Sequence, residues 1–226
     1  MKATTEATLR RAIVEVYAEL ARRGMNFSSA GNVSVRFGDG MLITPTGCTE
    51  ETLKTAHIVS AGFDGAHAGK YLPSSEWAMH AEVYARVPAT GAVIHTHADN
   101  CVALAALRKP IPAFHYMIHG FGGDDVPCVG YHAFGTPELA RAAATALEKR
   151  TGCLLANHGM LTQGPTLRAA FEAAIRLETL ARQYRLALSA GDPVLLNETE
   201  MARVAERYIE YGRQPRPVAK LPWRVP

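Results

Sequence analysis

The chain has 226 residues, of which 48% are hydrophobic and 20% charged, with a formal net charge of +3 at pH 7. This size and balance are typical of one globular domain, and the charge is too small to indicate nucleic acid or a membrane surface as a partner. No apolar run approaches the roughly 20 residues of a transmembrane helix, and residues 1–11 lack the apolar core of a signal peptide. Because the four cysteines are widely spaced, we expect reduced thiols and a cytoplasmic protein.

The first half of the chain predicts short strands between helices. Thr4 or Thr5 can cap a first helix, in which apolar residues recur at helical spacing. Ser74 or Ser75 can cap a second helix that runs to about Arg86. Alternating or short apolar runs predict strands at 33–37, 41–44, 58–63 and 91–95.

The second half predicts mainly helices. Thr136, Pro137 and Glu138 are typical of a helix start, with proline in the first turn. The predicted helices span 100–107, 136–150, 166–189 and 198–211, and the predicted strands span 153–157 and 160–163. We therefore expect one α/β domain over residues 1–212, followed by a Pro-rich tail over 213–226.

Three histidines follow predicted apolar strands. His95 and His97 are two residues apart, so on a strand their side chains project from the same face. His158 ends a second apolar strand, and Gly159 after it would let the backbone turn away. Three histidines with one open position are typical of catalytic rather than structural zinc. His57, His67, His80 and His132 are interpreted as structural.

Glu76 begins the second predicted helix and admits two interpretations. The first is a capping carboxylate that balances the helix dipole. The second is a general acid/base, which requires the start of this helix to face His95 and His97. The spacing alone leaves both open.

Three polar loops offer hydroxyls, amides and backbone N–H groups suited to a phosphate dianion. They contain the pairs Gly31 and Asn32, Thr46 and Gly47, and Ser74 and Ser75. The chain lacks the Gly-Lys-Ser/Thr of a P-loop, and no Gly-x-Gly-x-x-Gly follows its first strand. Each loop alone is weak evidence, because these residue types are common in turns.

Seven ordered segments together resemble the class II aldolase/epimerase family. The resemblance extends from the first helix to about Tyr211. The matching segments are 30–36 (AGNVSVR), 41–47 (MLITPTG), 72–77 (LPSSEW), 95–97 (HTH), 111–118 (IPAFHYMI), 126–128 (VPC) and 157–159 (NHG). The resemblance implies a mostly antiparallel central sheet with helices packed on both sides.

The resemblance also implies a role for each matching position. His95, His97 and His158 would bind one zinc ion per subunit. Glu76 would act as the acid/base and would ligate the metal when substrate is absent. The implied phosphate-binding positions are Gly31, Asn32, Thr46, Gly47, Ser74 and Ser75.

Two tyrosines are implied on the aldehyde side of the site. Tyr116 would reach in from a neighbouring subunit, and Tyr211 matches a second tyrosine near the carboxyl end. The family's aldolases form fourfold rings, so we expect a homotetramer with active sites between subunits.

The implied reaction is zinc-dependent, reversible cleavage of a ketose 1-phosphate such as L-fuculose 1-phosphate. Its products would be dihydroxyacetone phosphate and an aldehyde such as L-lactaldehyde. Phosphates of 5-deoxyribulose or methylthioribulose are alternative substrates, and dehydratases or decarboxylases of the family share the enediolate chemistry. The family's 4-epimerases have Asp at the position of Glu76. They also have an acidic acid/base in the segment that follows residues 111–113 (IPA), where this chain has no acid before Asp124. Both features favour the aldolase. A non-enzymatic relative is disfavoured because all three histidines and the acid are present.

Overall fold

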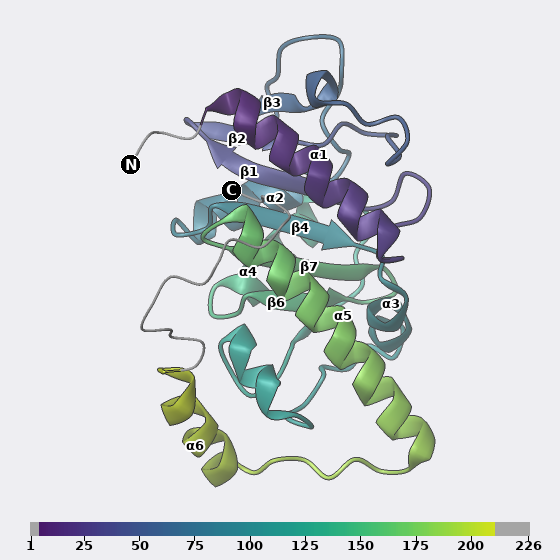
Figure 1. The fold of residues 1–226 in the computed structure, drawn as a ribbon, viewed down its shortest axis with the longest axis vertical. Helices are drawn as coiled ribbons and strands as arrows, with labels where there is room; N and C mark the ends of the chain where they lie inside the picture. Colours follow the sequence, from purple (N-terminus) through teal and green to yellow (C-terminus); the bar gives the residue numbers. More distant parts are fainter. Residues whose placement is uncertain (1–4, 211–226) are drawn as a thin grey trace.

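A seven-stranded sheet forms the centre of the molecule in the computed structural model, which describes residues 5–210 (Figure 1). Its strand order is β3-β2-β1-β4-β7-β6-β5, and all neighbouring pairs are antiparallel except the parallel pair β5 and β6. The mostly antiparallel sheet is therefore confirmed. The strands are β1 (Asn32–Phe37), β2 (Gly40–Ile43), β3 (Val59–Gly62), β4 (Ala92–Thr96), β5 (Cys128–Val129), β6 (Gly152–Leu155) and β7 (Gly159–Gly164).

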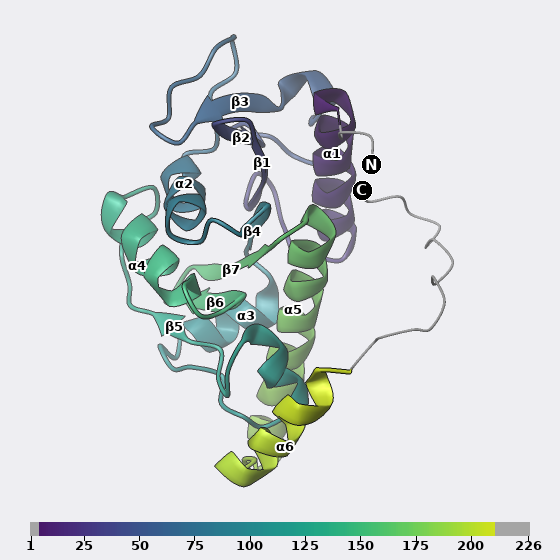
Figure 2. The same ribbon diagram turned by 90° about the vertical axis from the view of Figure 1, so that its left-hand side faces the viewer.

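Helices cover both faces of the sheet, as predicted (Figure 2). One buried cluster joins α1, α3 and α5 to one face, and a second joins α2 and α4 to the other. The helices are α1 (Glu6–Arg22), α2 (Trp77–Arg86), α3 (Asp99–Ala105), α4 (Pro137–Leu147), α5 (Leu167–Ala190) and α6 (Glu198–Tyr208), with short 3-10 helices η1 (Thr55–His57) and η2 (Tyr116–Phe121). Among the described residues, no helix is long and apolar enough to cross a membrane.

Side-chain caps begin most of these helices. Thr5 and Thr136 each accept a hydrogen bond from a backbone N–H of the first turn, as predicted. The predicted serine cap of α2 is wrong: Glu76 occupies the N-cap position and makes no side-chain cap hydrogen bond. Ser74 Oγ instead accepts a hydrogen bond from the Glu76 backbone N–H at 3.3 Å. The Glu76 carboxylate is thereby left for another contact.

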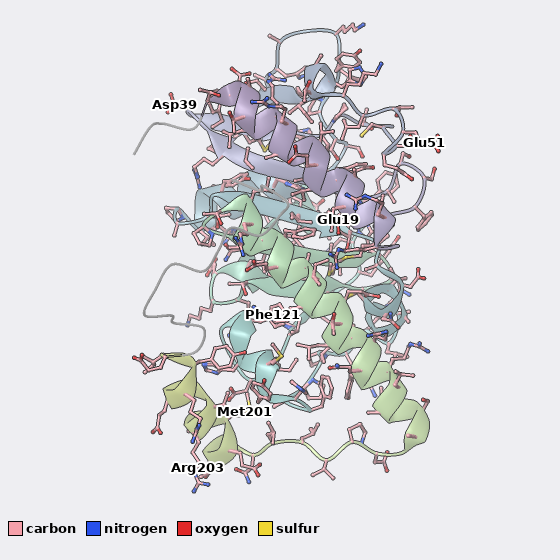
Figure 3. All side chains as sticks on the ribbon, viewed as in Figure 1. Glu19, Asp39, Glu51, Phe121, Met201 and Arg203 are labelled. Atoms are coloured by element: carbon pink, nitrogen blue, oxygen red, sulfur yellow. The ribbon has the colours of Figure 1, made fainter. Side chains whose placement is uncertain are left out.

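Several element ends differ from the predicted ones. Helix α4 stops at Leu147 rather than Arg150, and the Arg150 guanidinium pairs with Asp125 at 2.9 Å. Strand β5 has only two residues, too few for a periodic pattern, and it was missed. Helix α6 packs on η2 with Met201 buried and Arg203 on its outer side (Figure 3). The predicted tail, 213–226, lies outside the described residues.

Candidate active site and metal centre

Three histidines meet where strand β4 ends. His95 lies on β4, His97 follows that strand directly, and His158 lies in the turn between β6 and β7. Antiparallel pairing of β4 with β7 places His95 opposite Leu161, close to that turn. The ring centroids are 4.7–4.9 Å apart, and one nitrogen of each ring lies within 4.8 Å of the other two. The structure thus brings together the three histidines that the sequence singled out.

The turn that positions His158 depends on two unusual residues. Asn157, with φ of 52°, adopts the left-handed conformation that we expected glycine to provide. Gly159 is needed for a different reason: a Cβ there would lie 2.4 Å from the Thr96 carbonyl oxygen. The missing side chain lets β7 start directly against β4. The expectation that Gly159 makes the sharp turn is therefore corrected.

The Glu76 carboxylate completes the cluster. Its Oε2 lies 3.2 Å from His95 Nε2, and its Oε1 lies 3.4 Å from His158 Nε2. His97 Nε2 lies 3.0 Å from His95 Nε2. Bonds of 2.0–2.1 Å in tetrahedral zinc place ligand atoms about 3.3 Å apart. The three histidine nitrogens, which all lie within 4.8 Å of one another, could hold one divalent cation, and the Glu76 carboxylate lies beside two of them.

The protonation of the histidines suits metal binding. His95 Nδ1 donates a hydrogen bond to the Met160 carbonyl at 2.8 Å, which leaves the Nε2 lone pair directed at the cluster. Burial, followed by the neighbouring His95, lowers the pKa of His97 and of His158 to about 4. Both rings are therefore neutral near pH 7, the form that binds metals.

Glu76 is ionised in this setting although it is only 6% exposed. Burial alone would raise the pKa of its carboxyl, but the nearby His95 and His158 and an amide hydrogen bond outweigh burial and lower it. That amide belongs to Asn32, whose Nδ2 donates to Glu76 Oε2 at 3.1 Å. The side chain therefore serves the cluster rather than the helix terminus.

The three polar loops line one cavity of about 290 Å³ beside the histidines. Thr46, Gly47 and Ser75 are exposed there, and the amino end of α2 opens into it, where positive partial charge favours an anion. All six predicted phosphate positions line this cavity, together with Glu76, His97 and His158. A phosphate held by the loops would place the attached carbons next to the metal site.

Three side chains that line this cavity were missed by sequence reasoning: Tyr131, His132 and Phe134. They follow β5, the strand that was too short to predict, so no pattern placed them near the site. Tyr131 and Phe134 are exposed, unlike most large aromatic residues, and that exposure is visible only in the structure. His132, interpreted from sequence as structural, lines the cavity as well.

Tyr116, one of the two tyrosines predicted for the aldehyde side, does not line this cavity. Tyr116 begins η2, is 42% exposed, and lines a separate hollow with residues of α6 and Glu210. Tyr211 lies outside the described residues. The cavity of a single chain therefore lacks Tyr116.

A buried tyrosine joins two of the polar loops. The Tyr17 hydroxyl, on α1, lies 3.1 Å from the Cys48 carbonyl and 3.3 Å from the Ala30 carbonyl. These carbonyls follow Gly47 and precede Gly31, so one hydroxyl fixes the spacing of both loops. Burial raises the pKa of Tyr17, which keeps the hydroxyl proton available to donate.

We expect Tyr17→Phe to weaken the binding of inorganic phosphate about tenfold, because loss of the shared donor lets the loops separate and costs about 1–3 kcal/mol. Calorimetric titration with phosphate measures the change. Thr162→Val is the matched control, since Thr162 also donates to a buried carbonyl, that of Ala170 at 3.1 Å, without contacting either loop. Equal phosphate affinity in Tyr17→Phe and in the unmodified protein would contradict the assignment.

A cluster of three histidines and a carboxylate, beside a cavity lined by hydroxyls and amides, is typical of metal-dependent enzymes that act on anionic substrates. The family model described as Class II Aldolase and Adducin N-terminal domain matches residues 11–185, and the chain belongs to that family.

Curated relatives and solved structures agree with this assignment. A 5-methylthioribulose-1-phosphate/5-deoxyribulose-1-phosphate aldolase of Rhodospirillum rubrum is 45% identical over 90% of this chain and 92% of its own length. An L-fuculose phosphate aldolase of Escherichia coli strain K12 is 44% identical over 90% of this chain and 95% of its own length. A solved L-fuculose 1-phosphate aldolase superposes with a TM-score of 0.84 at 37% identity, over 89% of this chain and 96% of that structure.

These likenesses confirm the family, the fold and the enzyme class, an aldehyde-lyase of the class II type, that the sequence predicted. The relatives divide between two substrate groups at nearly equal identity, so identity does not choose between them.

Proposed function

We propose that this chain is a zinc-dependent aldolase that reversibly cleaves a ketose 1-phosphate to dihydroxyacetone phosphate and an aldehyde. The observation that supports this most strongly is that three histidine nitrogens and the Glu76 carboxylate lie together beside a cavity lined by all three polar loops. A substrate with a phosphate one carbon from its carbonyl fits that arrangement, because the loops hold the phosphate and the metal site receives the carbonyl end.

His95, His97 and His158 would hold the metal, with Glu76 as a fourth ligand in the absence of substrate. Bound there, zinc would supply Lewis-acid stabilisation of negative charge on the carbonyl and hydroxyl oxygens of the substrate. The neutral imidazoles match the ligand preference of zinc.

The chain's own groups would move the protons. In the synthetic direction, the Glu76 carboxylate takes a proton from the hydroxymethyl carbon of dihydroxyacetone phosphate. That carbon then bonds to the aldehyde carbon, and Tyr116 gives a proton to the aldehyde oxygen. Phosphate contacts at Thr46, Gly47 and Ser75 keep the reacting carbons in place and so lower the entropic barrier.

The position of Tyr116 favours the expected homotetramer. Its hydroxyl can serve the aldehyde side only from a second subunit, because the Tyr116 of the same chain lies at another hollow. Exposed apolar residues near the cavity supply a surface for such a subunit, namely Phe27, Leu72, Tyr131 and Phe134. The four free thiols suit a reducing compartment such as the cytoplasm.

L-fuculose 1-phosphate, which yields L-lactaldehyde, is the first candidate substrate. The second candidate is 5-deoxyribulose 1-phosphate or its methylthio analogue, favoured by the Rhodospirillum rubrum relative. The test incubates the zinc-loaded protein with each ketose 1-phosphate and measures dihydroxyacetone phosphate with a coupled dehydrogenase. We expect at least one of these ketose 1-phosphates to be cleaved. The kcat/KM for the preferred substrate should exceed that for the others at least about tenfold.

Release of triose phosphate from none of the ketose 1-phosphates would overturn the aldolase proposal. An epimerised, dehydrated or decarboxylated product in its place would assign the chain to another branch of the family. The same zinc-loaded protein without the substrate is the blank, and the chelated protein with the substrate shows whether turnover needs the metal.

A further inference from the structure

A line of buried polar side chains runs from the Glu76 carboxylate into the interface between α2 and the sheet. Glu76, His80 and Tyr84 are spaced four residues apart on α2, so they lie along one face of that helix. Asn32 and Ser34 are two residues apart on β1 and face that helix. Four residues of helix and two of strand each advance by about 6–6.6 Å, so the two rows can pair step by step.

The hydrogen bonds join these rows into one chain. Tyr84 OH lies 2.8 Å from Ser34 Oγ, and Ser34 Oγ lies 2.7 Å from His80 Nδ1. His80 Nε2 lies 2.5 Å from Asn32 Oδ1, and Asn32 Nδ2 lies 3.1 Å from Glu76 Oε2.

The direction of every hydrogen bond in this row follows from the bond between Asn32 and Glu76. An ionised carboxylate can only accept, so Asn32 must present its NH₂ group to Glu76 and its carbonyl oxygen to His80. His80 is then the Nε2–H tautomer, and its Nδ1 must accept the Ser34 hydroxyl proton. Ser34 Oγ in turn accepts from Tyr84, so all four donors point toward Glu76.

His80 and Tyr84 keep the protonation states that this row of hydrogen bonds needs. Burial, followed by the neighbouring His95, lowers the pKa of His80 to about 3, so the ring is neutral with one donor and one acceptor. Burial raises the pKa of Tyr84, so it remains a donor. Bonds aligned in one direction polarise one another and strengthen the last bond, which ends on Glu76 Oε2.

This arrangement leaves the two oxygens of Glu76 unequal. Oε2 is held by Asn32 and lies 3.2 Å from His95 Nε2. Oε1 is buried and accepts no hydrogen bond within the described part of the chain, and His158 Nε2 lies 3.4 Å from it. A carboxylate fixed through one oxygen presents the other in a defined direction.

We infer that His80 is a positioning residue, which fixes Asn32 and thereby holds Glu76 with Oε1 as the oxygen that exchanges protons with the substrate. An interface that needed only stability could use apolar residues, which bury no polar groups that must find partners. The inference rests on the proposed function, in which Glu76 is the acid/base.

The test compares His80→Leu, which removes both ring nitrogens, with His80→Gln, whose amide can donate to Asn32 and accept from Ser34. The readout is exchange of a hydroxymethyl proton of dihydroxyacetone phosphate with D₂O, measured by NMR per bound zinc. We expect His80→Leu to slow exchange about 10- to 100-fold, with the KM for this ligand and the zinc content unchanged. His80→Gln should recover part of the rate.

Ser34→Ala covers the case in which His80→Leu fails to fold. Loss of the Ser34 donor frees His80 to become the Nδ1–H tautomer, which would turn the Asn32 carbonyl toward the Glu76 carboxylate, so exchange should slow here too. Thr90→Val is the matched control: it loses a buried hydrogen bond to Gln163, of 3.0 Å, in the same sheet.

The positioning role is wrong, and the aldolase proposal stands, if folded His80→Leu exchanges protons as fast as Thr90→Val. Where His80→Leu does not fold, the same comparison is made with Ser34→Ala. If the unmodified zinc-loaded protein exchanges no proton, the proposed function itself fails and the inference falls with it. A variant with a lowered melting temperature but unchanged exchange would show a purely structural role.

Discussion

His158→Ala should release the metal and abolish aldol cleavage. His158 supplies one of three histidine nitrogens that lie within 4.8 Å of one another, so its loss removes one ligand from the proposed metal site. Lewis-acid stabilisation is worth several kcal/mol, so we expect kcat/KM to fall at least about 1000-fold. Zinc content after dialysis, measured by atomic absorption, should fall in parallel.

His158 is a better test than His95. His95 is fully buried and donates to the Met160 carbonyl, so its loss would also disturb the pairing of β4 with β7. His158 lies in a turn and is only partly buried, so the fold should survive. His67→Ala, at an exposed histidine away from the cluster, controls for metal on surface histidines. Full zinc content and turnover in His158→Ala would refute the three-histidine site.

The clustering of the three histidines could be predicted from the sequence because local rules govern their placement. Alternation along β4 placed His95 and His97 together, and a strand end placed His158 nearby. Spacing left the role of Glu76 open, because an N-cap position does not fix where its side chain points. In the structure the carboxylate lies 3.2 Å from His95 and 3.4 Å from His158 and makes no cap hydrogen bond, so the capping interpretation is wrong.

The partners of Glu76 could not be predicted in the same way. Asn32 and Ser34 lie more than 40 residues before their partners on α2, and their contact depends on how that helix packs on β1. One signal was present: the four-residue spacing of Glu76, His80 and Tyr84 along an otherwise apolar helix face. From the sequence, His80 is interpreted as structural, because the sequence does not show which strand residues a single histidine contacts.

Glu76→Gln should stop proton transfer while leaving zinc in place. The amide has nearly the shape of the carboxylate, and its oxygen can still accept from Asn32 Nδ2, but it cannot take a proton from carbon. We expect proton exchange of dihydroxyacetone phosphate to fall by about 100- to 10,000-fold, the range of a general base. The three histidines remain, so zinc content should stay within about twofold of the unmodified protein.

The matched control is Glu82→Gln, since Glu82 is a partly exposed acid on the same helix and pairs with Arg86 at 3.4 Å. It should exchange protons at the normal rate. Retained exchange in Glu76→Gln would remove Glu76 from the mechanism. Loss of zinc together with exchange would instead make Glu76 chiefly a ligand. If Glu76 supplies the proton-accepting oxygen and His80 only positions it, Glu76→Gln must slow exchange more than His80→Leu; the reverse order would contradict both assignments.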